Sequence, residues 1–342
     1  METCLPRIDF NAVTGWITRA AIVHGDNLPA ELARRLDIGP GQLSALLEQL
    51  TQQGWLVAHS QGQQTVYRPG ALRQVALTYA LAGLEEDLPW RRDFAPSFEL
   101  SRTQAQTLGQ AVSELLNNAI DHSGGTQVSL SLRQTPHSLQ LLVADDGIGL
   151  FQHLSETVAI SDPALALLEL SKGRLTSQPL HHCGHGLLLS VRLADVCVLQ
   201  ANGQSWMTRQ GDGGAWQSQL FKTTRNGTSV FLSIARDATR TPESVLSAWR
   251  ADDTDFSRTC VPLRLLVQDQ ASTMLHSRAD ARRVTPRLTT FALAELDFEG
   301  IEALGPAFTD ELLRVWARSH PQVQLKYLHA APQVLQALHR VT

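Results

Sequence analysis

Glu114 and Asn118 stand four positions apart in a stretch that begins near Ser101, where apolar side chains recur at helical spacing. Side chains four residues apart lie on the same face of a helix, one above the other. The apolar residues of this helix are expected to face a core. A carboxylate stacked on a carboxamide in such a helix therefore indicates a polar site rather than ordinary packing.

Two glycine-containing segments follow downstream. Residues 139–144 are typical of a buried strand, which runs into the turn Asp145-Asp146-Gly147-Ile148-Gly149. The two glycines of this turn permit close backbone approach or positive φ angles. The second segment, Cys183-Gly184-His185-Gly186-Leu187, opens an apolar helix. A helix N-terminus behind glycines favours the binding of an anion.

In this order, the three segments resemble the motifs of the GHKL ATPase superfamily. This superfamily includes gyrase B, the MutL repair proteins, heat-shock chaperone ATPases, histidine kinases and anti-sigma-factor kinases. Glu-x-x-x-Asn resembles the N box, Asp-x-Gly-x-Gly the first glycine box, and Gly-x-Gly-Leu the second. The resemblance covers about residues 97–236. It implies an α/β sandwich, an antiparallel or mixed sheet covered by helices, that binds ATP and Mg²⁺.

The resemblance also implies roles for individual residues. Glu114 is expected to be the general base that activates water, and Asn118 to hold Mg²⁺. Asp145 is expected to accept the adenine amino group, with Gly147 and Gly149 letting the purine lie against the backbone. The further nucleotide-binding positions that the resemblance implies are Asp121, Gly184, His185, Gly186, Leu187 and Thr228.

Two of these positions have alternative interpretations. Asp121 would either contact the nucleotide through water or simply be a solvated residue at a helix end. The cluster His181, His182, Cys183 and His185 has the chemistry of zinc ligands, but no second ligand pair at finger spacing accompanies it. The nucleotide interpretation of the loop is therefore preferred.

The elements expected around these motifs form one domain. After the motif helix, the spacing predicts a hairpin, then a long segment from residue 150 to 183 where GHKL proteins carry a mobile lid. The predicted strands are 127–133, 139–144, 196–201, 216–221 and 227–234, and the predicted helices are 163–170 and 186–194.

Residues 1–70 resemble bacterial regulators of the winged helix-turn-helix type. Helices are predicted over 13–24, 28–36 and 42–53, followed by short strands at 55–58 and 65–68. DNA binding through the third helix is one interpretation. That helix contains no Lys or Arg, however, and six arginines balance six acids over residues 1–75. Dimerisation or contact with a protein partner therefore stays open beside DNA binding.

The remaining segments are two connections and a C-terminal unit. Residues 71–96 are predicted to be a helical linker, and residues 237–260 a polar connector. Residues 261–342 alternate strands and helices, with strands at 263–267, 291–297 and 323–327, which predicts a small α/β domain. The turn Leu296-Asp297-Phe298-Glu299-Gly300 resembles that of STAS domains. Phosphoregulated STAS domains carry Ser or Thr after this Asp, so Phe298 favours a constitutive protein contact or a dimer.

Composition limits the class of protein. The chain has 342 residues, a net charge of −4 and 43% hydrophobic residues, which fits a multidomain α+β protein. No apolar run is long enough to span a membrane. The four cysteines are widely spread, which predicts a reduced, cytoplasmic protein.

These observations predict a bacterial molecular switch. Mg-ATP would bind the central domain and be hydrolysed slowly, and the nucleotide state would control dimerisation, or partner or DNA binding, by the flanking domains. Two alternatives stay open: a protein kinase of the anti-sigma-factor type acting on an external protein, and a transcription regulator for which ATP is only a ligand.

Overall fold

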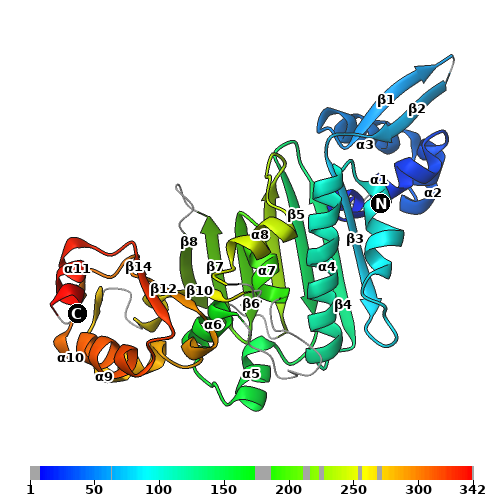
Figure 1. Ribbon diagram of the computed structural model, residues 1–342. Helices are drawn as coiled ribbons and strands as arrows, with labels where there is room; N and C mark the ends of the chain where they lie inside the picture. Colours follow the sequence, from blue (N-terminus) through cyan, green and yellow to red (C-terminus); the bar gives the residue numbers. More distant parts are fainter. Residues whose placement is uncertain are drawn as a thin grey trace.

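The computed structural model describes residues 8–62, 64–173, 186–210, 216–222, 227–252, 256–267 and 272–340, for residues 216–222 the backbone only. Figure 1 shows an elongated molecule whose three parts follow one another in chain order. A helical module with a projecting hairpin lies at one end, a broad sheet in the middle and an α/β unit at the other end. This arrangement is multidomain α+β, as the sequence predicts.

The N-terminal module contains every helix and strand predicted for it. Its elements are α1 (Phe10–His24), α2 (Leu28–Leu36), α3 (Pro40–Gln52), β1 (Leu56–Gln61) and β2 (Gln64–Pro69). The carboxylate of Asp9 accepts hydrogen bonds from the backbone of Asn11 and Ala12, which caps α1. Ile17, Leu28 and Leu32 are fully buried, in a core separate from that of the rest of the chain.

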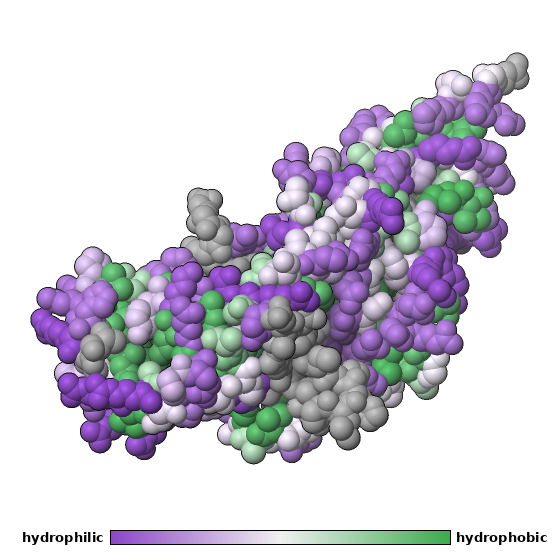
Figure 2. Space-filling view, in the orientation of Figure 1, coloured by the Kyte–Doolittle hydropathy of each residue, from purple (hydrophilic) through white to green (hydrophobic). Residues whose placement is uncertain are grey.

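One end of this module exposes apolar side chains. Ile22 is 43% and Val23 is 70% exposed at the end of α1. They border a groove lined by residues 22–27, Arg68 and Pro69. Figure 2 shows apolar surface interrupting the polar surface of the module. Exposed apolar side chains that lie together on a groove favour contact with a protein.

The central sheet has seven strands in the order β3-β4-β5-β9-β6-β7-β8, and every neighbouring pair is antiparallel. The strands are β3 (Arg73–Ala80), β4 (Gln127–Gln134), β5 (Ser138–Asp145), β6 (Val196–Ala201), β7 (Gln204–Gln210), β8 (Trp216–Lys222) and β9 (Ser229–Ala235).

The prediction of a helix within residues 71–96 is wrong at β3, which forms an edge of this sheet. Val75, Leu77 and Tyr79 alternate with polar or small residues, and this period of two fits a strand. Only the short helical turns Trp90–Phe94 and Ala95–Ser97 follow it. Strand β7 was also not predicted, although Asn202-Gly203 before it is a strong hairpin signal.

Helix α4 (Arg102–His122) carries the polar pair and covers the sheet, as Figure 1 shows. It begins at Ser101, whose hydroxyl accepts from the backbone of Gln104 while the Gln104 side chain accepts from the backbone of Ser101. Its apolar face is buried in the main core: Leu108, Ala111, Val112, Leu115, Leu116 and Ala119. The other helices of this part are α5 (Leu150–Val158), α6 (Pro163–Lys172), α7 (Gly186–Leu193) and α8 (Pro242–Ala248).

The C-terminal unit is built on a three-stranded parallel sheet in the order β10-β12-β14. Its strands are β10 (Arg258–Pro262), β12 (Leu293–Asp297) and β14 (Gln324–Leu328), and its helices are α9 (Arg278–Val284), α10 (Pro306–Thr309) and α11 (Pro332–His339). A π-helix, Asp310–Ala317, continues α10, and β11 (Met274–Leu275) pairs with β13 (Ala303–Leu304).

Two expectations about this part are corrected. The predicted strand 263–267 is instead a 3₁₀ helix at Leu263–Leu266, and the first strand lies just before it, as β10. Residues 237–260 are also more than a connector, because they contain α8 and most of β10. The apolar run after Pro262 gives a strong but misplaced strand signal, since a short apolar run does not separate a strand from a buried helical turn.

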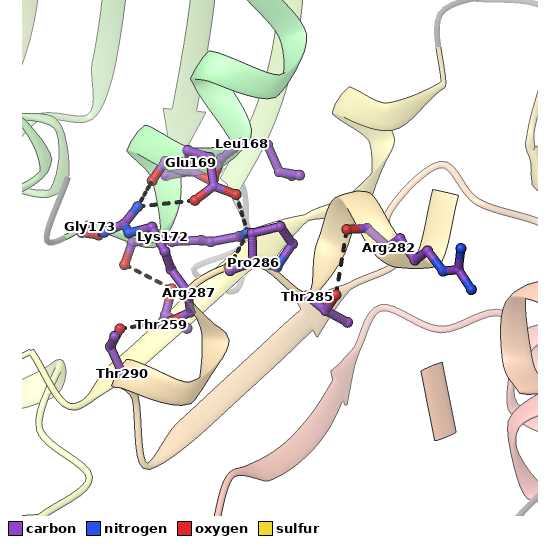
Figure 3. Close-up of polar contacts among 11 residues, drawn as sticks. Leu168, Glu169, Lys172, Gly173, Thr259, Arg282, Thr285, Pro286, Arg287 and Thr290 are labelled. Atoms are coloured by element: carbon purple, nitrogen blue, oxygen red, sulfur yellow. Dashed lines mark hydrogen bonds and ion pairs between the residues drawn. The ribbon is translucent and has the colours of Figure 1, made fainter. Parts of the chain in front are cut away.

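A buried polar cluster joins the C-terminal unit to α6 (Figure 3). The ammonium of Lys172, whose side chain is fully buried, contacts the Glu169 carboxylate and donates to the carbonyl of Pro286 at 2.9 Å. Arg287 pairs with Glu169 at 3.1 Å and donates to the carbonyl of Gly173 at 2.6 Å. Burial lowers the pKa of Lys172, and the charge of Glu169 opposes that shift. The cluster fixes the end of α6 to the C-terminal unit.

In the part of the chain that the structure describes, no helix is both long enough and apolar enough to cross a membrane.

Candidate nucleotide-binding site

Glu114 lies half-buried on α4, where two neighbours determine its position. The side-chain amide of Gln110, one turn earlier, donates to Oε1 of Glu114 at 2.7 Å. Gly186, the first residue of α7, packs against the other oxygen, because a Cβ built on Gly186 would lie only 2.0 Å from Oε2. A carboxylate at the start of a helix is favoured by the helix dipole. Glu114 therefore lies where α4 meets the start of α7.

Asp145 ends β5 and is 8% exposed. Its Oδ1 accepts from the backbone N–H groups of Gly147, at 2.9 Å, and Thr228, at 3.1 Å. Thr228 immediately precedes β9, the strand beside β5, so the sheet itself brings these residues together. The two backbone donors fix the orientation of the carboxylate.

Different constraints require glycine at the two positions of the turn: a close backbone contact at Gly147 and a positive φ angle at Gly149. A Cβ on Gly147 would lie 2.2 Å from the carbonyl oxygen of Ser123, the residue after α4. The N–H of Ile148 donates to the same carbonyl at 2.8 Å, which attaches the turn to the end of α4. Gly149 has a φ of 86°, which is unfavourable for residues with a side chain, and it is the N-cap residue of α5.

Asp146 is exposed and points away from Asp145, toward the start of β4. Its carboxylate accepts from the backbone of Thr126, at 2.7 Å, and of Gln127, at 2.9 Å, and from the Thr126 hydroxyl. These hydrogen bonds lower the pKa of Asp146 to about 2. Asp146 therefore fastens the turn to the sheet.

Asn202 is a positioning residue that the sequence analysis missed. It lies in the turn between β6 and β7, and its Oδ1 accepts from the backbone of Phe151 and Gln152, at 3.0 and 3.2 Å. Its Nδ2 donates to the carbonyl of Ile148 at 2.7 Å. Asn202 thus caps α5 and binds the glycine turn at Ile148. Gln110 was also missed, although its spacing of four from Glu114 was a usable signal.

The remaining predicted positions fall into two groups. Asn118 is half-buried one turn after Glu114, Asp121 is exposed at the end of α4, and Leu187 is half-buried in the first turn of α7. Gly184 and His185 lie outside the described residues. The structure thus brings the motif segments together along α4, with the α7 start at Glu114 and the glycine turn at Ser123.

Two segments of the chain match known families. Residues 84–209 match the histidine kinase-like ATPase domain, and residues 280–335 match a STAS-like domain of unknown function. The chain therefore contains a histidine kinase-like ATPase domain followed by a STAS-like domain. Both were predicted from the sequence, with limits that differ from those of the matches.

Comparisons with individual proteins add little. No curated protein matches the chain. One similar solved structure is described as the crystal structure of the N-terminal domain of a DNA repair protein. It is 16% identical, with a TM-score of 0.21, over 36% of this chain and 34% of that one. The chain thus spans about a third of that structure.

Proposed function

We propose that this chain is an ATP-driven switch: its central domain binds and slowly hydrolyses Mg-ATP, and the nucleotide state controls what the flanking units bind. The observation that supports this most is the meeting of three polar segments along α4. Glu114 contacts the start of α7, and Ser123 contacts the turn that follows Asp145. These are the segments that bind the phosphates, Mg²⁺ and adenine in the ATPases that the motifs resemble.

The residues of this site suit Mg-ATP. Asp145 is an oriented carboxylate, the kind of acceptor that an adenine amino group requires. Asn118 offers one carboxamide oxygen, which suits Mg²⁺ because this ion keeps most of its water and phosphate ligands. Mg²⁺ would neutralise phosphate charge when bound. Gly186 and Leu187 would present backbone N–H groups at the start of α7, where an anion is stabilised.

Glu114 would act as the general base in hydrolysis. Its Oε1 is held by Gln110, and its location between α4 and α7 is half-buried, so the carboxylate is oriented and partly shielded from solvent. Phosphoryl transfer depends mostly on positioning and charge stabilisation, so one oriented carboxylate is sufficient for the base.

The test is phosphate release from Mg-ATP, measured beside ATP binding. Glu114→Gln should reduce turnover by about 100-fold or more, as expected for loss of a general base, and should keep ATP affinity. Asp145→Asn should lose both, because the backbone N–H groups of Gly147 and Thr228 would hold its single acceptor oxygen, and the remaining amide nitrogen cannot accept a hydrogen bond from the adenine amino group. Glu302→Gln, an exposed acid in the C-terminal unit, is the matched control.

If the wild-type protein binds ATP but releases no phosphate, the proposal that it hydrolyses ATP is refuted. Phosphate transferred to a protein instead of water would indicate a kinase. If Asp145→Asn bound ATP as wild type does, the proposed role of Asp145 in binding adenine would be wrong.

The fold supports control of the flanking units by the central domain. The main hydrophobic core runs without a break from the sheet into the C-terminal unit, and α6 is fixed to that unit by the Glu169–Lys172–Arg287 cluster. At the other end, the backbone of Gln74 in β3 donates to the hydroxyl of Thr18 in α1 at 3.0 Å. A movement of α6 would therefore shift the C-terminal unit, and a movement of β3 would shift α1 of the N-terminal module.

The order of three helices and a hairpin supports the assignment of residues 1–70 as a winged helix. We propose that it contacts a protein or a second copy of the chain rather than DNA. Helix α3 has no Lys or Arg to contact phosphate, while Ile22 and Val23 expose apolar surface beside a groove.

A further inference from the structure

Three potential metal ligands meet at one edge of the C-terminal sheet. Asp297 is the last residue of β12, and His329 directly follows β14, the parallel strand beside it in Figure 1. Glu299 comes two residues after Asp297. The carboxyl ends of neighbouring parallel strands reach the same edge of a sheet, which is where ligands bind in open α/β folds. This edge belongs to none of the three motif segments of the candidate nucleotide site.

The ligand atoms of these three residues converge. One carboxylate oxygen each from Asp297 and Glu299 and one ring nitrogen of His329 all lie within 4.8 Å of one another. Nδ1 of His329 and Oδ1 of Asp297 are 2.9 Å apart, and the same Oδ1 accepts from the backbone of Glu299 at 3.0 Å. Asp297 is only 4% exposed, so this carboxylate is well shielded from solvent.

The His329–Asp297 contact leaves the Glu299 carboxylate without a partner for one of its oxygens. Oε2 of Glu299 is buried and has no hydrogen-bond partner, and among the described residues Glu299 forms no ion pair. An unpaired buried acceptor costs free energy, more so when it is charged. A cation bound by all three residues would satisfy this oxygen.

The charges around these three residues are compatible with a bound cation. Arg192 of α7 is close enough to Asp297 for their charges to interact, which offsets one carboxylate. The carboxylates of Asp297 and Glu299 together attract a divalent cation, and Arg192 offsets part of their charge.

We propose that Asp297, Glu299 and His329 bind a divalent transition-metal ion, with Zn²⁺ the preferred ion. Carboxylate oxygens and imidazole nitrogen are zinc ligands at about 2.0–2.2 Å, which places ligand atoms about 3.4 Å apart in a tetrahedron. The three ligand atoms lie within 4.8 Å of one another, and the 2.9 Å separation of His329 Nδ1 and Asp297 Oδ1 would have to widen to admit the ion between them. Three protein ligands leave the fourth position for water or for a group of a binding partner.

The experiment is a Zn²⁺ titration of the full chain by calorimetry in ATP-free buffer, with thermal unfolding measured with and without Zn²⁺. Wild type should bind one Zn²⁺ at this site, and Zn²⁺ should raise its unfolding temperature. Glu299→Gln and His329→Ala should each weaken binding at least tenfold and remove the stabilisation. Glu302→Gln and His339→Ala, which remove an exposed acid and an exposed histidine nearby, should bind as wild type does.

Two results would overturn the proposal. One is wild-type protein without stoichiometric Zn²⁺ binding. The other is binding that survives in Glu299→Gln and His329→Ala but is lost in His182→Ala, because the zinc would then belong to the His181-His182-Cys183 segment. Glu299→Gln keeps the size of the side chain and His329 is exposed, so both variants should fold. Neither result depends on ATP hydrolysis, so the proposal stands or falls independently of the nucleotide site.

Discussion

At the scale of single residues, Gly186 tests the contact between Glu114 and the start of α7. Gly186→Ala would place a Cβ 2.0 Å from Oε2 of Glu114, far inside the contact distance, so the carboxylate or the start of α7 must move. We expect a lower unfolding temperature and at least a tenfold loss of phosphate release. Gly41→Ala is the matched control, because nothing lies within 4 Å of a Cβ there and alanine favours helix α3. Equal behaviour of the two variants would refute the contact.

Asp146 provides a pH-dependent test of the turn. Its pKa is about 2 in the folded chain and about 3.9 when unfolded, so its contribution is present above about pH 4 and is lost as the pH falls toward 2. Asp146→Asn should therefore lower the unfolding temperature at pH 5 to 7, and the difference from wild type should shrink below pH 4. Glu85→Gln, which removes an exposed acid, should show no such trend. A difference that stayed constant down to pH 2 would contradict the role of Asp146.

At the scale of elements, α6 tests how the central domain is joined to the C-terminal unit. Glu169→Gln would leave the cations of Lys172 and Arg287 together without their anion, at a cost of about 3–5 kcal/mol. Lys172→Met leaves Glu169 paired with Arg287, and should cost only about 1–3 kcal/mol. Denaturant unfolding measures both, and the order of the two effects is the prediction. A larger effect for Lys172→Met would mean that the Lys172 bond to Pro286 dominates the cluster.

Helix α5 shows how an element far away in sequence positions the site. Its first turn is capped by Asn202, about fifty residues downstream, which also bonds the carbonyl of Ile148. Asn202 has a φ of 47° and Gly203 one of 77°, the conformation of a tight hairpin turn. The hairpin β6–β7 therefore serves the glycine turn as well as the sheet.

At the scale of the whole molecule, the histidine kinase-like ATPase domain lies between two units that differ in their construction. The N-terminal module has a core of its own, whereas the C-terminal unit shares the core of the central sheet. The switch that we propose would therefore move the C-terminal unit together with α6, and would reach the N-terminal module mainly through β3. The proposed metal site lies on the unit that shares the core, at its parallel-sheet edge.

The sequence by itself determined the motifs and most of the elements that carry them. Local signals are enough for α4, with its capping residues Ser101 and Gln104, and for the turn after β5, where Gly147 and Gly149 follow a buried strand. The spacing of Glu114 and Asn118 already placed both on one helical face. These features depend on neighbours within a few residues, so a sequence pattern contains them.

Only the tertiary structure decided which residues from different segments touch. Three contacts each join residues thirty or more positions apart: Gly186 with Glu114, Asn202 with the start of α5, and Glu299 with His329. Strand β3 has a local signal, the alternation of Val75, Leu77 and Tyr79, but its place at the sheet edge depends on pairing with β4, some fifty residues later. Sheet pairing and packing are long-range interactions, and they override local propensity.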